Sequence, residues 1–465
     1  MVSLKPREVN MLEGSLVRSI LVYSFPLIIS NLLQILYSAA DMIVVTLSGT
    51  EGAIGSIGTT GALINLVVNL FIGFSVGANV VVARRIGAGD PKGAERAVHT
   101  SILMSVLFGL AGAGIGIVIS RPMLTLMGDE GRILSMAAKY SVIRFAGIPF
   151  LSLTNFGIAI YRAKGDTQTP LYILTASGIL NVLLNLFFVL VFHMDVDGVA
   201  LATILSQLFS AVLLLVGLSR TDGLCRFSVR KLKICMADAK EILSVGIPAG
   251  VQGALYSVSN MIIASSIIRV NNTLCPGGSA VIDGNSAAAN LGQFVTTMGE
   301  AMALACVSFT SQHYGAKKFR RMGTVFRDFF LLSTAIVALP TVLVLLFRIP
   351  LLRLYVTDPM ALETGTLRLY LILGTYLLAL AMNLSSNILR GLGKSSLAAL
   401  ITLVFTCVLR VIWIYTVFEK VQTLTSVYIS YPISWGIAAI FHTVCFLRIW
   451  KRLKRENPEP AGKGA

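Results

Sequence analysis

The chain has 465 residues, of which 55% are hydrophobic and 13% are charged, and its formal net charge is +16. A soluble globular domain has about 25% charged residues, so the composition argues against an ordinary soluble enzyme or binding module. Apolar runs long enough to cross a bilayer recur along the whole sequence. They predict an all-α polytopic membrane protein.

Hydrophobic windows predict twelve transmembrane helices. The first apolar run is too long for the core of a signal peptide, so we interpret it as a retained span. The first six windows lie at 16–47, 54–82, 98–120, 134–161, 169–193 and 197–219. The other six lie at 240–269, 285–311, 324–347, 362–389, 396–418 and 424–447.

The basic residues predict the orientation of these spans. Most of the 38 Lys and Arg residues fall on the face that holds both termini, above all in 84–96, 220–240, 317–327 and the C-terminal tail. Basic loops stay on the cytoplasmic side, so both termini are expected in the cytoplasm, with the chain in the plasma (inner) membrane. We interpret the clusters as topology signals that contact anionic membrane lipids, and we expect no nucleic-acid binding.

The two halves of the chain resemble each other. Six helices per half is an even number, so the halves are expected to be parallel repeats related by a pseudo-two-fold axis along the membrane normal. Two of the matching segment pairs share an offset of 228 residues. The pairs are YSAADMI (37–43) with YSVSNMI (256–262), ARRIGAGDPKGAER (83–96) with SQHYGAKKFRRMG (311–323), and YRAKGDTQTP (161–170) with LRGLGKSSLA (389–398).

This repeat predicts two six-helix lobes. The N-lobe covers 1–222, a polar cytoplasmic linker covers 223–240, and the C-lobe with its basic tail covers 241–465. Secondary transporters built in this way place their binding site between the lobes, near the membrane midplane. The sequence contains no filter motif typical of a channel.

Asp41 is an acid inside the first apolar run. A charged Asp at the centre of a membrane helix costs about 2.5–3.5 kcal/mol. Desolvation favours its protonated form, so Asp41 is a candidate for exchanging a proton or another cation. The alternative is a structural Asp that is hydrogen-bonded to a neighbouring helix.

Other polar residues lie on the same helices. Gln34 and Tyr37 share one helix face with Asp41, and the fifth and sixth spans add Asn181, Asn185 and Thr203. Amides on apolar helices also serve to hold helices together. Both interpretations remain open for the asparagines.

The second half differs chemically from the first. Asn260 stands at the repeat position of Asp41, and Glu300 is an acid deep in the eighth span. Glu300 is interpreted either as a second proton or substrate carboxylate or as the ion-pair partner of Arg410 or Arg368. Pro26 is expected to kink the first helix, and we take it as a candidate hinge.

The ordered set of these motifs resembles the multidrug and toxic compound extrusion (MATE) family over about residues 14–447. That resemblance implies export of cationic amphiphiles in exchange for protons or sodium ions, with Asp41 in the cation site and Gln34 nearby. It also implies that Asn181, Asn185 and Thr203 belong to this site, although many relatives carry Asp where Asn185 stands. The seventh helix offers Gln252, Tyr256 and Asn260 to the substrate cleft.

The function predicted from the sequence is therefore a cation-coupled multidrug antiporter with alternating access between two lobes. We expect a monomer with no cofactor other than the coupling ion, no metal site and no enzymatic activity. The alternative is a flippase for a lipid-linked oligosaccharide or another amphiphile, which a cationic cleft would favour. Arg144, Arg368 and Arg410 inside predicted spans keep this alternative open.

Overall fold

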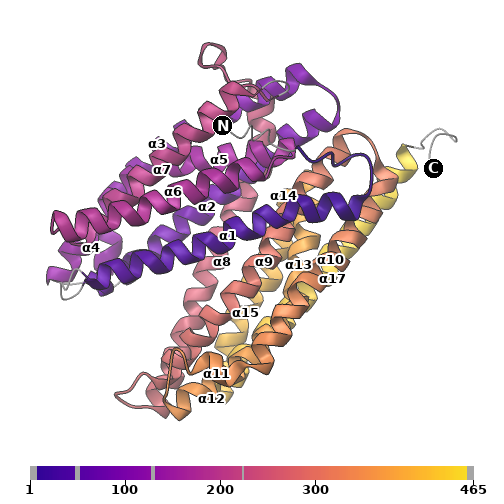
Figure 1. The fold of residues 1–465 in the computed structure, drawn as a ribbon. Helices are drawn as coiled ribbons and strands as arrows, with labels where there is room; N and C mark the ends of the chain where they lie inside the picture. The colour runs from indigo at the N-terminus through magenta and orange to yellow at the C-terminus, as the bar shows by residue number, and fades with distance from the viewer. Residues whose placement is uncertain (1–7, 48–52, 127–130, 222–224, 458–465) are drawn as a thin grey trace. The chain divides into compact units, whose positions relative to one another are not determined.

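The computed structural model describes residues 8–47, 53–126, 131–221 and 225–457, and their regular structure is entirely helical (Figure 1). The first half contains α1 (Leu16–Leu47), α2 (Ala53–Gly87), α3 (Pro91–Leu126), α4 (Gly131–Ala146), α5 (Ile148–Lys164), α6 (Gln168–Leu186), the π-helical η1 (Phe187–Val191) and α7 (Val196–Arg220). A 3₁₀ turn, η2 (Val229–Lys231), follows. The second half contains α8 (Met236–Leu274), α9 (Ala280–Gly315), α10 (Phe319–Leu346), α11 (Arg348–Leu352), α12 (Pro359–Arg368), η3 (Leu369–Leu373), α13 (Tyr376–Gly391), α14 (Ser395–Thr402), η4 (Leu403–Val408), α15 (Leu409–Trp413), η5 (Ile414–Phe418), α16 (Glu419–Val421) and α17 (Leu424–Glu456).

The helices confirm the prediction of an all-α membrane protein. Among the described residues, ten helices are long and apolar enough to span a membrane, and the number is twelve when each of two bent pairs counts as one span. The bends fall inside the predicted windows 134–161 and 362–389 and measure 45° and 41°. The windows were predicted as single spans, so these bends are a new finding.

The bend between α4 and α5 has a local cause. Pro149, in the first turn of α5, has no N–H to donate to the preceding turn. A Cβ on Gly147 would lie 2.6 Å from Cγ1 of Ile204 in α7. The chain can therefore bend here and still pack against α7 only because residue 147 is glycine.

The loops that follow the second and fourth spans of each half show the predicted repeat in the backbone. Gly89 and Gly165 have φ values of 66° and 97°, and Lys317 and Gly393 have 55° and 70°. Each residue of the second pair lies 228 positions after its counterpart, which is the offset read from the sequence. The left-handed turn is thus kept even where lysine replaces glycine.

Contacts divide the chain into two compact units. The first is Met1–Asn10 with Val22–Ala254, and the second is Met11–Leu21 with Leu255–Ala465. Helices α1 and α8 each contribute to both units. This division follows packing rather than the repeat, and the lobe boundaries predicted from the sequence stay a prediction.

In the first unit, α2 and α8 cross at a seam of four glycines. A Cβ on Gly73 would lie 2.3 Å from Cα of Gly250, and one on Gly77 would lie 2.2 Å from the carbonyl oxygen of Ile242. From the other side, a Cβ on Gly246 would lie 2.8 Å from the carbonyl oxygen of Phe74. Both helices carry glycines four residues apart, the spacing that lets membrane helices approach closely.

An ion cluster joins the same two helices and α3. Asp238 is fully buried; its carboxylate accepts from Arg85 Nη2 at 3.0 Å and from Arg96 Nε at 2.6 Å. One turn along α8, Glu241 accepts from Arg84 Nη1 at 2.9 Å. The two arginines that contact Asp238 compensate for its loss of hydration.

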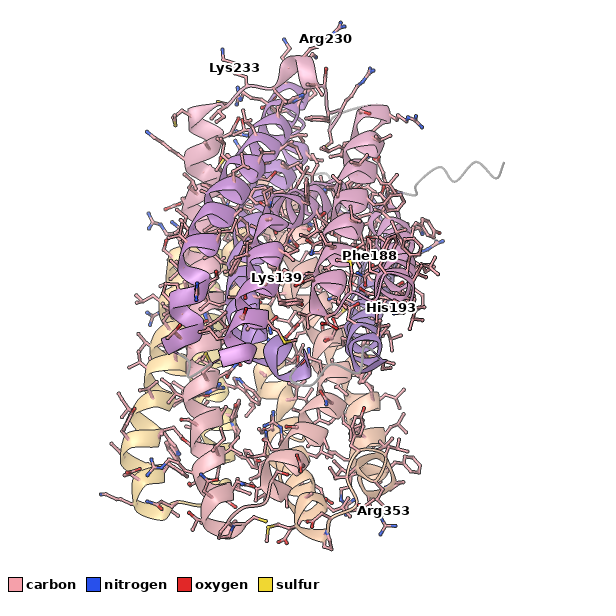
Figure 2. The ribbon with its side chains drawn as sticks, turned by 90° about the vertical axis from the view of Figure 1, so that its left-hand side faces the viewer. Lys139, Phe188, His193, Arg230, Lys233 and Arg353 are labelled. Carbon is pink, nitrogen blue, oxygen red and sulfur yellow. The ribbon has the colours of Figure 1, made fainter. Side chains whose placement is uncertain are left out.

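The end of the predicted linker that the structure describes, residues 225–235, is docked on the first unit. His99 Nε2 lies 3.0 Å from both the amide nitrogen and the carbonyl oxygen of Ser228, and its Nδ1 lies 2.7 Å from the Glu95 carbonyl oxygen. Phe227 stacks on the His99 ring, and burial raises the pKa of the Cys225 thiol to about 12. Arg230 and Lys233 project outward from this segment (Figure 2).

In the second unit, α9 packs against α10 and α13, and α13 packs against α17 (Figure 1). Residues 11–21 are held to this unit by α10. Arg321 donates to the Leu12 carbonyl at 2.5 Å and to the Gly14 carbonyl at 2.6 Å, and Lys318 also donates to Leu12 at 3.2 Å.

The glycine seam predicts a large difference between two glycine substitutions. Gly73→Ala places a methyl group inside the α8 backbone, so we expect a loss of about 1–3 kcal/mol from overpacking. Gly114→Ala in α3 meets no atom within 4 Å and should be neutral or slightly stabilising, because alanine favours helix. Thermal unfolding in neutral detergent measures the stability of both variants. Equal unfolding midpoints would contradict the close approach of α2 and α8 at Gly73.

Candidate functional site

The packing of α1 on α6 depends on Tyr37 and Gly178. A Cβ on Gly178 would lie 2.0 Å from Cε2 of Tyr37, so the phenol ring occupies the space above the glycine. The Tyr37 hydroxyl also donates to the Thr175 carbonyl at 3.3 Å. The two helices therefore approach closely one turn away from Asp41.

This approach brings Asp41 to the asparagines of α6. Asn185 Nδ2 donates to Asp41 Oδ1 at 2.5 Å and lies 3.3 Å from Asn181 Oδ1. Both asparagines are buried, and Asp41 is half-buried. Asp41 makes no ion pair within the described residues, although Arg144 acts on it electrostatically.

The cluster leaves two buried polar atoms without a partner. Asn185 Oδ1 accepts no hydrogen bond and Asn181 Nδ2 donates none. A buried polar atom without a partner costs about 1–3 kcal/mol. The Asn185 Oδ1 can coordinate a cation or accept from a protonated group, whereas the Asn181 Nδ2 can only donate to an acceptor.

Apolar side chains surround the end of α1 beyond Asp41. Val44 packs in a buried cluster with Tyr140, Val189 and Val199. Such surroundings strengthen electrostatic interactions and make charge on Asp41 more costly. An uncompensated charge on this carboxylate is therefore unfavourable.

Thr203 and Gln34 do not make hydrogen bonds to this cluster in the structure. The Thr203 hydroxyl donates to the Val199 carbonyl of its own helix at 2.9 Å. Gln34 is exposed on α1. The roles predicted for Thr203 and Gln34 stay predictions.

Pro26, the candidate hinge, lies within the continuous helix α1. Its carbonyl accepts from the Ser30 hydroxyl at 2.8 Å.

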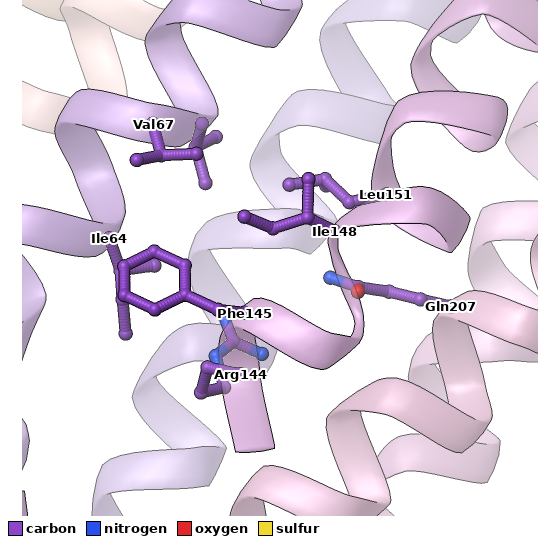
Figure 3. Close-up of a pocket in the computed structure, with 8 residues that line it drawn as sticks. Ile64, Val67, Arg144, Phe145, Ile148, Leu151 and Gln207 are labelled. Atoms are coloured by element: carbon purple, nitrogen blue, oxygen red, sulfur yellow. The ribbon is translucent and has the colours of Figure 1, made fainter. Parts of the chain in front are cut away.

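A small pocket lies beside the bend at Gly147. Figure 3 shows Arg144 and Gln207 among its otherwise apolar lining, which includes Ile64, Val67, Phe145, Ile148 and Leu151. Arg144 makes no ion pair within the part of the chain that the structure describes. Arg144 and Gln207 therefore bring a cation and an amide to an otherwise apolar lining.

In the second unit, Glu300 lies beside a tyrosine. A Cβ on Gly299 would lie 2.7 Å from the Tyr376 hydroxyl, which donates to the Thr296 carbonyl at 2.9 Å. Glu300 is exposed and forms no ion pair among the described residues, Arg410 and Arg368 included.

The polar face of α8 runs from Gln252 through Tyr256 to Asn260. All three are half-buried, and Asn260 Oδ1 is buried without a hydrogen-bond partner. Gln252 belongs to the first unit and the other two to the second.

Arg368 donates to Asn285 Oδ1 at 2.6 Å and lies over the Tyr428 ring. The groups that stabilise its positive charge are therefore neutral.

Reasoning from sequence missed several residues that build these sites. No sequence motif marks Gly178 or Tyr376, because each acts through a contact with a residue on another helix. The glycine pairs of α2 and α8 did carry a signal, in the segments GFSVG (73–77) and GIPAG (246–250). Asp238 and Arg85 were visible only as members of basic or polar loops.

Comparison with known proteins identifies the architecture. The family model described as MatE matches residues 26–187 and 248–416. The probable multidrug resistance protein YoeA of Bacillus subtilis is 24% identical over 95% of both chains. The FAD transporter of Shewanella oneidensis is 23% identical over 76% of this chain and 77% of its own.

A solved structure has the same fold. A multidrug resistance MATE family transporter in an outward-facing conformation superposes with a TM-score of 0.88 at 23% identity. The match covers 97% of this chain and 99% of that one. It confirms the predicted helical membrane architecture.

The contact between Tyr37 and Gly178 can be tested by a double-mutant cycle. Gly178→Ala should cost about 1–3 kcal/mol because the new methyl group overlaps the phenol ring. In a Tyr37→Ala background the same substitution should cost much less, since the ring is gone. Thermal unfolding midpoints of the four proteins give the coupling. Additive effects would show that the ring does not set the α1–α6 distance.

Proposed function

Because the chain belongs to the MatE family of multidrug export transporters, we propose that it exports small amphiphilic molecules in exchange for protons or sodium ions. Members of this family are transporters, not enzymes. The observation that carries the proposal is the carboxylate of Asp41, half-buried within a span and hydrogen-bonded to the Asn185 amide.

The proposed exchange follows from the free energy of a charge at membrane depth. An uncompensated carboxylate there is costly, and a proton or a bound cation removes that cost. Asn185 can stabilise the anion through its Nδ2 and bind a cation through its unpaired Oδ1. Coupling arises if the ion and the substrate occupy the site in turn.

We place alternating access in the helices that both units share. The chain passes between the units within α1, at Leu21 and Val22, and within α8, at Ala254 and Leu255. Pro26 and Pro248 lie within these helices close to these points, and a proline interrupts the backbone hydrogen bonds of its helix. Pro26 is accordingly our candidate hinge.

The substrates are proposed to be amphiphilic cations. The residues assigned to the cleft are Gln34, Tyr37, Gln252, Tyr256, Asn260 and Glu300, with Asn181 and Thr203 assigned beside Asp41. Aromatic rings and single polar groups accept varied lipophilic cations with few fixed contacts. The protein is proposed to act as a monomer within membrane lipid, and no cofactor other than the coupling ion is required.

A second candidate is a flippase or exporter of anionic amphiphiles. Arg144 lines the apolar pocket beside Gly147 without an ion-pair partner in the described chain. One relative is named as a transporter of FAD, which is an anionic molecule. The two candidates differ in the charge of the substrate.

The assignment of Asp41 is tested by efflux of a fluorescent organic cation from energised vesicles. Asp41→Asn should lower gradient-driven efflux about tenfold or more. If the coupling ion is a proton, each pH unit of gradient supplies about 1.4 kcal/mol per exchanged proton, and the variant cannot use this free energy. Glu363→Gln, an exposed acid in α12, is the matched control and should keep its activity. Imposing proton and sodium gradients separately identifies the coupling ion. Undiminished efflux in Asp41→Asn rejects the assignment.

We propose that the protein lies in the plasma (inner) membrane with both termini on the cytoplasmic side. In a background without the six native cysteines, Lys233→Cys should react with an impermeant maleimide only after the membrane is opened. Arg353→Cys, which is also exposed, should react in intact cells. The reverse labelling pattern would invert the proposed topology.

A further inference from the structure

Arg410 is the largest fully buried side chain of the described residues. It lies in α15, between the π-helical segments η4 and η5, a backbone form that is often found at functional sites. Its Nε donates to the Ser434 hydroxyl at 2.8 Å. Both Nη1 and Nη2 are buried and have no hydrogen-bond partner.

Three aromatic rings surround this guanidinium group. Its central carbon lies 4.1 Å from the centroid of Tyr431, 5.6 Å from Trp435 and 5.7 Å from Tyr256. The indole Nε1 of Trp435 is a further buried donor without a partner. Two helices, α8 and α17, therefore enclose a cation beside three nitrogens with unused N–H groups.

The rings compensate for only part of the charge. Cation–π contacts stabilise a desolvated guanidinium, but they leave its outer N–H groups unsatisfied. Nη1 and Nη2 together present the edge that binds two oxygens of a carboxylate or a phosphate. Within the described residues, no Asp or Glu forms an ion pair with Arg410.

We propose that Arg410 and Trp435 form a binding site for the carboxylate or phosphate headgroup of an amphiphilic molecule. The headgroup accepts from Nη1, Nη2 and the indole N–H, and the apolar part packs on the rings of Tyr431 and Tyr256. Binding at this site is independent of Asp41. The assignment of the bound amphiphile as exported cargo rests on the proposed export function.

Trp435 supplies the reporter for a binding experiment. The chain has three tryptophans, so Trp413→Phe with Trp450→Phe leaves Trp435 as the only one. The full-length protein in neutral detergent is titrated with hexanoate, with hexyl phosphate and with hexyltrimethylammonium. We expect a saturable change in Trp435 emission with at least one of the two anions and none with the cation.

Variants of Arg410 test which group binds the anion. Arg410→Met should abolish the response, and Arg410→Lys should weaken the apparent affinity about tenfold, because a lysine cannot bind two oxygens at once. Arg348→Gln is the matched control, since Arg348 also lies over a tyrosine ring, at 4.9 Å from Tyr370, and it should leave the titration unchanged. If Arg410→Met does not fold, the lysine variant carries the comparison.

The outcomes separate the alternatives. A response to hexanoate alone identifies a carboxylate site, and a response to hexyl phosphate alone identifies a phosphate site. No saturable response in the Trp435-only protein, or an equal response in Arg410→Lys or to the cation, overturns the proposal and makes Arg410 structural. Asp41→Asn should keep the titration while it loses efflux, so a failure of the export proposal is distinguishable from a failure of this one.

Discussion

The free energy of taking a charge out of water is the constraint on which this structure depends. Three charges that are buried or half-buried show three ways of meeting it. Asp238 accepts from two arginines on different helices. Asp41 accepts from a neutral amide, and Arg410 is enclosed by aromatic rings. Elsewhere in the described chain the same rule explains why Arg368 rests on Asn285 and Tyr428.

These arrangements differ in how readily the charge can change partners. A carboxylate held by two guanidinium groups loses a great deal if one partner leaves, which suits the fixed crossing of α2 and α8. A carboxylate held by one amide loses far less when a proton or cation arrives. The degree of compensation therefore distinguishes charges that are fixed by ion pairs from a charge that can be neutralised without breaking an ion pair.

Much of the architecture was predictable because it depends on local sequence patterns, such as hydrophobic runs and repeated segments. The twelve hydrophobic windows coincide with helical spans, and the offset of 228 residues recurs in the left-handed residues Gly165 and Gly393. A hydrogen bond between Asp41 and a neighbouring helix was one of the alternatives left open by the sequence, but only the family resemblance grouped Asp41 with Asn185. The Tyr37–Gly178 contact and the bend at Gly147 were not, since each depends on a neighbour that is distant in sequence. The hydrogen bond of Thr203 was not predictable either, because its hydroxyl donates to the Val199 carbonyl of its own helix and not to the Asp41 cluster.

The docked linker has a consequence for measurements of motion. Residues 225–235 are attached to α3 through His99 and Thr100, and α8 up to Ala254 packs with the first unit. Spin labels or fluorophores placed on α7 and on the beginning of α8 would thus report a constant separation throughout a transport cycle. Informative probe pairs need one member within residues 22–254 and the other beyond residue 255, because residues 11–21 pack with the second unit.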